Sequence, residues 1–544
     1  MKSPVESVTR SDRVCRTLRR WLAEGSPCKE ISPRFLLWLV PAALVFFSIA
    51  VTSLQRKSAT FDEPVYVVAG LTYLTLHDYT LKEDAPPLVG YLAGLSPWLH
   101  GLRAPADTLE FQDSLYREYG FSRDLLYRSG FDADRILFWG RFAILVPFGL
   151  LLLATVFVWA TLLFGRLAGI FALFLTALSP NLIAHGRLVA ADFPVSAAML
   201  LASFMLWRFT DRGSARAALL SGLTLGLALV TKYTALVLLP CFVVVLGVYW
   251  ARVPSGERLP AYKASALIFV PAAAIIFFIY GWPPDPSRYV HGVLTIYRNI
   301  RPDLPWGYLF GDFYSDAVPY YYPAALAVKT SLPLLAVGLA GLVLLRRHRA
   351  DLLAELCLLL PAFLLLVVAS FDEVASGIRR VLPVLPVMAI VGSRWVTCES
   401  AGAARRLALA TALIAFQAAT TLSAWPHYIP YFNEIARLAA RGQPLLDDSN
   451  IDWGQDLKAL PATLRRHGIS HVYLSYFGMA DPNYYGIRYT RLPLQLLREP
   501  VPGVYAVSLQ NLIWLRRSGP FWIHTQEPFD RAGTSILLFL APPG

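Results

Sequence analysis

The chain has 544 residues, 56% of them hydrophobic and only 16% charged, and its mean hydropathy is +0.48. A soluble domain averages about 45–50% apolar and about 25% charged residues, so this composition excludes an ordinary soluble protein. The net charge of +12 would suggest a nucleic-acid partner in a soluble protein. Here the basic residues collect in short loops between apolar runs, where they meet anionic lipid, and we find no nucleic-acid-binding motif. We therefore expect membrane lipid, and no nucleic acid, as a partner.

The amino-terminal residues 1–34 are polar and basic and predict a cytoplasmic tail. The first apolar run, 35–54, follows a segment that is long for a cleaved signal peptide, so we interpret it as an uncleaved signal anchor. Ten further apolar runs come close to the ~20 residues that cross a bilayer. They are 136–164, 167–184, 192–210, 216–232, 233–251, 263–281, 323–345, 351–370, 378–396 and 404–424. The sequence thus predicts a polytopic α-helical protein with about 11 transmembrane helices in a domain spanning 35–424.

Alternate loops between these spans are basic, which fixes the orientation because cytoplasmic loops are rich in Lys and Arg. The basic residues are Arg166, Arg208, Arg212, Arg216, Arg252, Arg258, Lys263, Arg346, Arg347, Arg349, Arg394, Arg405 and Arg406. Merging the two short spans at 216–251 would place Arg346, Arg347 and Arg349 outside, so we keep both. No cysteine falls in the outer segments. We expect a bacterial inner-membrane protein with a cytoplasmic amino terminus.

Three segments are then predicted on the outer, periplasmic face. The first outer loop, 55–135, contains pieces 64–76 and 88–100, which are apolar on one side, too short to span, and typical of helices lying in the interface. A second segment, 282–322, is dense in Tyr, Trp, Pro and Asp. The third, 425–544, has a helix-like run at 455–467 and strand-like runs at 472–477, 503–508 and 535–541, which predict a small α/β domain.

Ionisable residues gather at this outer rim, where they are costly near lipid and are functional candidates by default. They are Asp62, Glu63, Glu83, Asp84, Asp192, Lys232, Asp372, Glu373 and Arg379. Asp62 and Glu63 precede Pro64, so Asp62 is either a helix cap or a carboxylate that can deprotonate a hydroxyl or hold a cation.

Two further acidic sites have the same two interpretations. Glu83 and Asp84 precede Pro86-Pro87, and they are either solvated loop residues or a second acidic group brought close to Asp62 by one short helix. Asp192 begins a span and is either a cap or a site acid.

Two cations lie at the outer ends of spans: Lys232 in Leu229-Val230-Thr231-Lys232-Tyr233 and Arg379 in Gly377-Ile378-Arg379. They either extend to the headgroups or bind the phosphate of a lipid, and Arg141 is a weaker third candidate for that phosphate.

Taken in order, these motifs resemble the GT-C membrane glycosyltransferases of the family 39 type, which includes protein O-mannosyltransferases and aminoarabinose transferases. The resemblance covers most of the chain. It rests on Asp62-Glu63 after the first span, the acid before Pro86-Pro87-Leu88, Asp192, Gly226 to Lys232, Gly377-Ile378-Arg379, and, as in a bacterial subgroup, Tyr431 to Glu434 with Asp448 to Leu457. The sequence departs from the family's pattern at Asp84-Ala85 and lacks a tripartite sugar-binding repeat, which does not favour a protein acceptor.

The resemblance implies a GT-C-like fold and transfer of a sugar from a polyprenyl-phosphate donor to an acceptor hydroxyl of a glycan, lipid or protein. Asp62 would then be the general base, with Glu63 and Asp192 as further catalytic carboxylates, while Lys232, Arg379 and Arg141 would hold the phosphate and Glu83 and Asp84 would contact substrate. No cofactor is required. A divalent metal between Asp62, Glu63 and Asp192 would be compatible with these residue types, although nothing in the spacing demands one.

Two other classes of function stay open. A secondary transporter also has many spans and buried charges, but it usually shows paired repeats and ion sites near the midplane. A non-enzymatic envelope assembly protein is the third interpretation, and it leaves the positions of Lys232 and Arg379 unexplained.

Overall fold

A computed structural model describes residues 33–105, 116–254, 258–298, 307–346, 351–372, 374–397, 402–440 and 442–541. The predicted basic tail, 1–34, lies almost entirely outside the described residues, as does Glu373.

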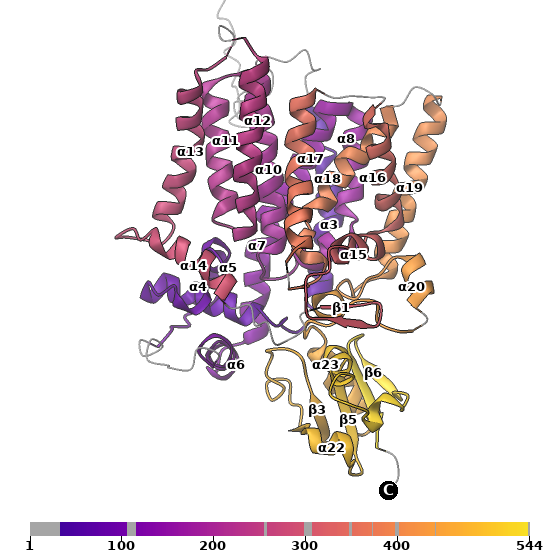
Figure 1. Ribbon diagram of the computed structural model, residues 1–544. Coiled ribbons are helices and arrows are strands. Elements are labelled where there is room, and N and C mark those ends of the chain that lie inside the picture. The colour runs from indigo at the N-terminus through magenta and orange to yellow at the C-terminus, as the bar shows by residue number, and fades with distance from the viewer. Residues whose placement is uncertain are drawn as a thin grey trace, which may run out of the picture.

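Long apolar helices stand side by side in a bundle (Figure 1). Within the described residues, seven helical segments are long and apolar enough to cross a membrane, and an eighth span is formed if the bent pair α8 (Arg166–Ala177) and α9 (Pro180–Gly186), which meet at 57°, counts as one. The seven are Arg34–Leu54 (mostly α3, Leu39–Leu54), α7 (Ala133–Phe164), α10 (Asp192–Arg212), Tyr233–Arg252 (mostly α12, Leu238–Arg252), α13 (Ala261–Phe278), α17 (Leu352–Ser370) and Ala404–Ser423 in α19 (Ala403–Ser423). The protein is therefore a polytopic helical membrane protein.

The remaining three of the eleven predicted spans coincide with shorter apolar helices, α11 (Ala215–Leu229), α16 (Leu332–Val343) and α18 (Val384–Gly392). These three stand within the bundle beside the longer helices (Figure 1). By length and composition, then, the structure supports seven or eight spans and not the full eleven.

Two short helices cross the foot of the bundle instead of running along it (Figure 1). They are α4 (Glu63–Leu76) and α5 (Leu88–Leu99), in the places where the sequence predicts short helices. Residues 63 to 73 of α4 are buried on every side, which is more burial than a helix lying in the interface needs. The cause is close packing on α5: a Cβ on Gly70 would lie 1.7 Å from the carbonyl oxygen of Gly90.

The carboxyl-terminal part forms a mixed five-stranded sheet in the order β4-β3-β5-β7-β6. The strands are β3 (Val472–Ser475), β4 (Tyr489–Arg491), β5 (Val504–Ser508), β6 (Asp530–Ala532) and β7 (Ile536–Leu540). β3 runs parallel to β4 and β5, while β7 runs antiparallel to β5 and β6. The three predicted strands are confirmed as β3, β5 and β7, and the predicted helix at 455–467 is shorter, as α21 (Leu460–Arg466).

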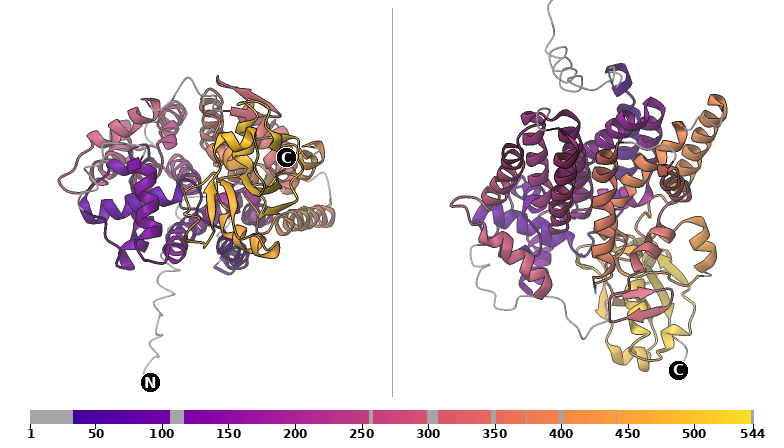
Figure 2. Two further views of the ribbon diagram at one scale, coloured as in Figure 1. Left: turned by 90° about the horizontal axis from the view of Figure 1, so that it is seen from below. Right: turned by 45° about the horizontal axis from the view of Figure 1, so that its top comes forward.

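The sheet and the α4–α6 region (α6, Phe121–Arg128) lie next to each other under the same end of the bundle (Figures 1 and 2). The segment between α13 and α17 contributes three elements to this end: α14 (Ser287–Arg298), the hairpin of β1 (Gly307–Leu309) and β2 (Asp312–Tyr314), and α15 (Tyr321–Lys329). All the segments that the sequence predicts on one face of the membrane therefore meet at one end of the molecule.

The packing of α4 on α5 leads to a first prediction. Gly70→Ala should lower the free energy of unfolding by roughly 1–3 kcal/mol, because the added methyl group would overlap backbone atoms that cannot move aside. The melting temperature of the purified protein in detergent measures the effect.

Gly247→Ala is the matched control, since Gly247 also lies inside a helix, α12, and a Cβ there would meet nothing within 4 Å. That variant should be as stable as the parent or slightly more so. Equal melting temperatures for Gly70→Ala and Gly247→Ala would show that the two helices are less tightly packed.

Candidate active site

Asp62 is the residue immediately before α4, yet its side chain makes no capping hydrogen bond to that helix. Its carboxylate instead accepts a hydrogen bond from Nη1 of Arg379 at 3.3 Å. The interpretation of Asp62 as a cap is therefore not supported, and its carboxylate faces a residue more than 300 positions away in the sequence.

Arg379 is the centre of the candidate site because three carboxylates surround its guanidinium. Nη1 lies 3.3 Å from Asp62 and 3.8 Å from Asp192, and Nη2 lies 3.9 Å from Asp448. The guanidinium also lies over the Trp453 ring, 4.3 Å from its centroid, where the π-face attracts a cation. Three negative groups from distant segments thus share one cation.

Lys232 completes this group, which we call the acid–base cluster: Asp62, Asp192, Asp448, Lys232 and Arg379. Its ammonium group lies 2.5 Å from Asp192, a residue whose side chain is almost fully buried at the start of α10. Both cations that were expected to bind a phosphate are therefore engaged with carboxylates. The carboxylates of the cluster also outnumber its cations, so the cluster does not favour another anion.

Glu63 and Arg141, which were predicted to be catalytic and phosphate-binding, face each other inside the protein. Arg141 donates from Nε and Nη2 to the two carboxylate oxygens of Glu63, at 2.7 and 2.6 Å, and both side chains are almost completely buried. Burial opposes ionisation of Glu63, but Arg141 outweighs it and lowers the pKa of this carboxyl group. Neither side chain faces open space, and direct contact with substrate stays a prediction for both.

The remaining hydrogen bonds of this pair join several segments of backbone. The guanidinium donates to the carbonyls of Leu54, Lys57 and Ser58, and the Glu63 carboxylate accepts from the N–H groups of Thr60 and Val189. The pair therefore fixes the backbone that leads into Asp62.

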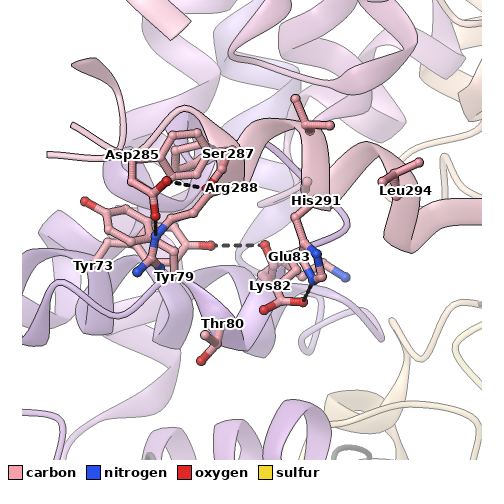
Figure 3. A pocket seen from close by; sticks show the side chains of 14 residues that line it. Tyr73, Tyr79, Thr80, Lys82, Glu83, Asp285, Ser287, Arg288, His291 and Leu294 are labelled. Atoms are coloured by element: carbon pink, nitrogen blue, oxygen red, sulfur yellow. Dashed lines mark hydrogen bonds and ion pairs between the residues drawn. The ribbon is translucent and has the colours of Figure 1, made fainter. Parts of the chain in front are cut away.

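A cavity of about 600 Å³ lies between the turn after α4 and helix α14 (Figure 3). Its lining is mainly apolar and includes the rings of Tyr73, Tyr79 and Tyr280. Glu83, one of the two predicted substrate acids, lines it as well and lies 3.3 Å from Nε2 of His291 on α14.

Asp84, the other predicted acid, pairs with Lys82, a lining residue of the cavity that the sequence analysis left unassigned. The Lys82 ammonium group lies 2.9 Å from Asp84 and 3.0 Å from Glu118. Burial disfavours its charge, but Asp84, Glu118 and Asp62 outweigh burial and raise the pKa of Lys82 well above its usual value. Burial raises the pKa of Glu118 as well. Lys82 is thus a permanent cation between the cavity and Asp62.

The sequence analysis missed the contribution of Asp448 and Trp453 as well as that of Lys82. The available signal was the polar run from Asp448 to Asp456, which follows the last apolar helix and is unusually rich in Asp, Asn and Gln. In the sequence, this run supports only the family resemblance, because nothing in it indicates that the run packs against Arg379.

Among the described residues, no group of three or more His, Cys, Asp or Glu side chains is placed to hold a metal ion. Of the three carboxylates considered for a metal, Glu63 faces Arg141, and the Arg379 guanidinium contacts both Asp62 and Asp192. A permanent cation between two would-be ligands does not fit a divalent metal.

Comparison with known proteins gives one family match. Residues 138–278 match the model of the family described as dolichyl-phosphate-mannose-protein mannosyltransferase. The predicted resemblance is confirmed for this stretch. The matched stretch runs from α7 to the end of α13. It includes Arg141, Asp192 and Lys232, but not Asp62 or Arg379. Among curated proteins, none matches the sequence significantly.

Solved structures extend the similarity of fold to most of the chain. The apo crystal structure of ArnT from Cupriavidus metallidurans has a TM-score of 0.50 and 12% identity, over 92% of this chain and 97% of that one. The same ArnT bound to undecaprenyl phosphate has a TM-score of 0.46 and 13% identity over the same shares. The oligosaccharyltransferase AglB from Archaeoglobus fulgidus, with an inhibitory peptide and a dolichol-phosphate, has a TM-score of 0.43 and 13% identity, over 73% of this chain and 55% of that one. The protein has an ArnT-like fold.

The buried pair gives a second prediction. Glu63→Gln should destabilise the protein by about 3–5 kcal/mol, because it leaves the Arg141 charge buried without a counter-ion. Arg437→Gln, which neutralises a half-exposed residue paired with Glu434, is the control and should change little. Melting temperatures in detergent give the comparison. An unchanged melting temperature combined with lost activity would instead favour the direct catalytic role that the sequence predicts for Glu63.

Proposed function

We propose that this protein is a membrane glycosyltransferase that transfers a sugar from a polyprenyl-phosphate donor to an acceptor hydroxyl. The observation that carries the proposal is the position of Asp62, whose carboxylate is oriented by Arg379 within the acid–base cluster and near the Lys82 side of the cavity. The family match over residues 138–278 and the ArnT-like fold support it.

The donor binds, in this proposal, in the cavity under α14. The apolar and aromatic lining suits the lipid-proximal part of a polyprenyl chain, and Lys82 is a lining cation that meets the phosphate by releasing Asp84 or Glu118. Glu118 shares Lys82 with Asp84, and its raised pKa means that it takes up a proton more readily than an ordinary carboxyl group. A protonated Glu118 would no longer neutralise the charge of Lys82, so the local net charge would be more positive for the phosphate.

In the transfer step, the Asp62 carboxylate takes the proton of the acceptor hydroxyl. The acceptor oxygen forms a bond to the anomeric carbon of the sugar while the bond from that carbon to the phosphate oxygen breaks. The polyprenyl phosphate leaves with its charge, which nearby cations stabilise. We assign Arg379 and Lys232 first to the orientation of Asp62 and Asp192, since those are the groups they contact, and a direct contact of either cation with phosphate forms only if it releases a carboxylate.

We place this chemistry on the periplasmic side of a bacterial inner membrane. The acid–base cluster and the sheet lie at the same end of the bundle, and the basic loops that indicate the cytoplasm lie between the spans at the other end. The acceptor is then a glycan, lipid or protein exposed on the periplasmic face.

The proposed base provides the test of the function. Asp62→Asn keeps the size of the side chain and removes its ability to take up a proton, so transfer should fall by about 100-fold or more. Cells that lack the protein should accumulate a polyprenyl-phosphate sugar and lose one envelope glycan, both measured by mass spectrometry. The wild-type protein should restore the glycan, and the Asp62→Asn variant at equal abundance should not.

Asp530→Asn is the matched control, because it makes the same chemical change on β6, in an ion pair with His467 that is not part of the cluster. It should restore the glycan as the wild type does. Lipid-linked sugars and glycans that do not change when the protein is removed would refute the transferase function, and full restoration by Asp62→Asn would refute the role of Asp62.

The orientation has its own test. A cysteine placed at Ser518, an exposed residue of the carboxyl-terminal part, should react with a membrane-impermeant maleimide in cells whose outer membrane alone is permeabilised. A cysteine at Arg252, exposed at the other end of α12, should react only after the inner membrane is lysed. The reverse pattern of labelling would invert the proposed topology.

A further inference from the structure

The segment from Asp447 to Leu457, which we call the bridging segment, binds the turn that carries Arg379. The Ser449 hydroxyl donates to the carbonyl of Ser376 at 2.8 Å, and the Ile378 N–H donates to Oδ1 of Asn450 at 3.0 Å. The contact needs a glycine at position 377, where φ is +83° and a Cβ would lie 2.7 Å from the Ser449 hydroxyl oxygen.

The same segment also binds the loop that leads to Asp62. The Phe61 N–H donates to the carbonyl of Trp453 at 2.9 Å, and the Ser58 N–H donates to that of Gln455 at 3.1 Å. The bridging segment thereby sets the separation of Asp62 and Arg379. It contributes Asp448 to the acid–base cluster although it follows the last long helix in the sequence.

Within this segment, Asp448 has a strained backbone. Its φ is +52°, in the left-handed region, which Asp adopts more readily than most residues but still at a cost relative to glycine. Such strain persists only where the surroundings enforce it, and it is frequent at functional sites.

The side chain of Asp448 carries a second cost. Its Oδ2 atom is buried and has no hydrogen-bond partner in the described part of the chain. It lies 3.9 Å from Nη2 of Arg379, which is too long for a hydrogen bond. A buried carboxylate oxygen without a donor is unfavourable, and a ligand that supplies a donor removes the penalty.

We propose that Asp448 is a substrate-binding residue that accepts a hydrogen bond from a hydroxyl group of the sugar donor or of the acceptor. This rests on the proposed transferase function. The carboxylate surplus of the cluster disfavours a phosphate or an acidic sugar at this position, whereas a hydroxyl supplies the missing donor without adding negative charge. The transferred sugar or acceptor is then one that presents a free hydroxyl to Asp448 and no acid group.

The test uses two variants whose residues can adopt the positive φ of position 448. Asp448→Gly removes the carboxylate and suits the left-handed φ, and Asp448→Asn removes the charge while keeping a side chain that tolerates this conformation. Phe310→Gly is the matched control, because Phe310 has a φ of +54° and an exposed side chain that is not part of the cluster, so it receives the same backbone relief without the loss of a carboxylate. Neither Gly variant should melt at a lower temperature than the parent.

The affinity of each purified protein in detergent is measured for undecaprenyl phosphate and for undecaprenyl-phosphate mannose, glucose and galactose. The sugar of the donor adds affinity to that of undecaprenyl phosphate alone. If Asp448 contacts this sugar, both Asp448 variants should lose about ten- to a hundred-fold of this added affinity, the size expected for a hydrogen bond to a charged group. Their affinity for undecaprenyl phosphate itself stays at the wild-type level or rises. For a contact to the acceptor, the sugar-dependent affinity is intact while glycan transfer in complemented cells falls by the same factor.

Sugar-dependent affinity and transfer that are both intact in Asp448→Gly would overturn the proposal. A loss of similar size in Phe310→Gly would overturn it as well, since the effect would then come from the backbone. If the wild-type protein binds none of the four lipids and removing it changes no glycan, the transferase function itself fails, an outcome distinct from intact transfer in the variants.

Discussion

The buried ion pair of Glu63 and Arg141 is the interaction on which the site depends. Two charges inside a helix bundle are tolerable only when each satisfies the other, and here the five N–H and C=O groups around them are satisfied as well. The pair joins the end of α3, the start of α4 and the middle of the chain near Val189 to α7. Asp62 is the residue before Glu63. Because the contacts of Glu63 fix its position, they also restrict the backbone conformation of Asp62 and so the direction of its side chain toward Arg379.

A second buried pair plays the corresponding part for the sheet. Lys57 lies 2.5 Å from Asp456, which also accepts hydrogen bonds from the backbone and hydroxyl groups of Thr534 and Ser535. Burial opposes the charge of Asp456, but Lys57 and these donors outweigh it and lower its pKa to about 2. The carboxylate stays ionised at any physiological pH, and it holds the turn before β7 against the loop that leads to Asp62. The sheet is therefore fastened to the site by charge as well as by packing.

Much of this arrangement follows from local features of the sequence, and some of it does not. Apolar length predicts the long helices, and strand-like runs predict β3, β5 and β7. The cost of charge near lipid indicates Asp62, Asp192, Lys232 and Arg379, which the structure brings together. Pairing is what the sequence does not reveal: Glu63 and Arg141 have the same residue types as site groups, and only their mutual distance shows that they satisfy each other. The sequence does not reveal the role of Asp448 either. Its positive φ and its missing hydrogen-bond donor arise only when residues 447–457 pack against residues 376–379.

The position of the bridging segment also has a consequence for the timing of activity. Ribosomes deliver Asp62 first, the Arg379 turn much later, and Asp448 only after the last long helix; Asp456 gains its partners when residues 534 and 535 emerge, just before the final strand. A chain cut short before that point would insert its helices and yet leave Asp62 and Arg379 without the bridge that spaces them. Under the proposed function, fragments that end before residues 534 and 535 would therefore reach the membrane without an active arrangement of Asp62 and Arg379.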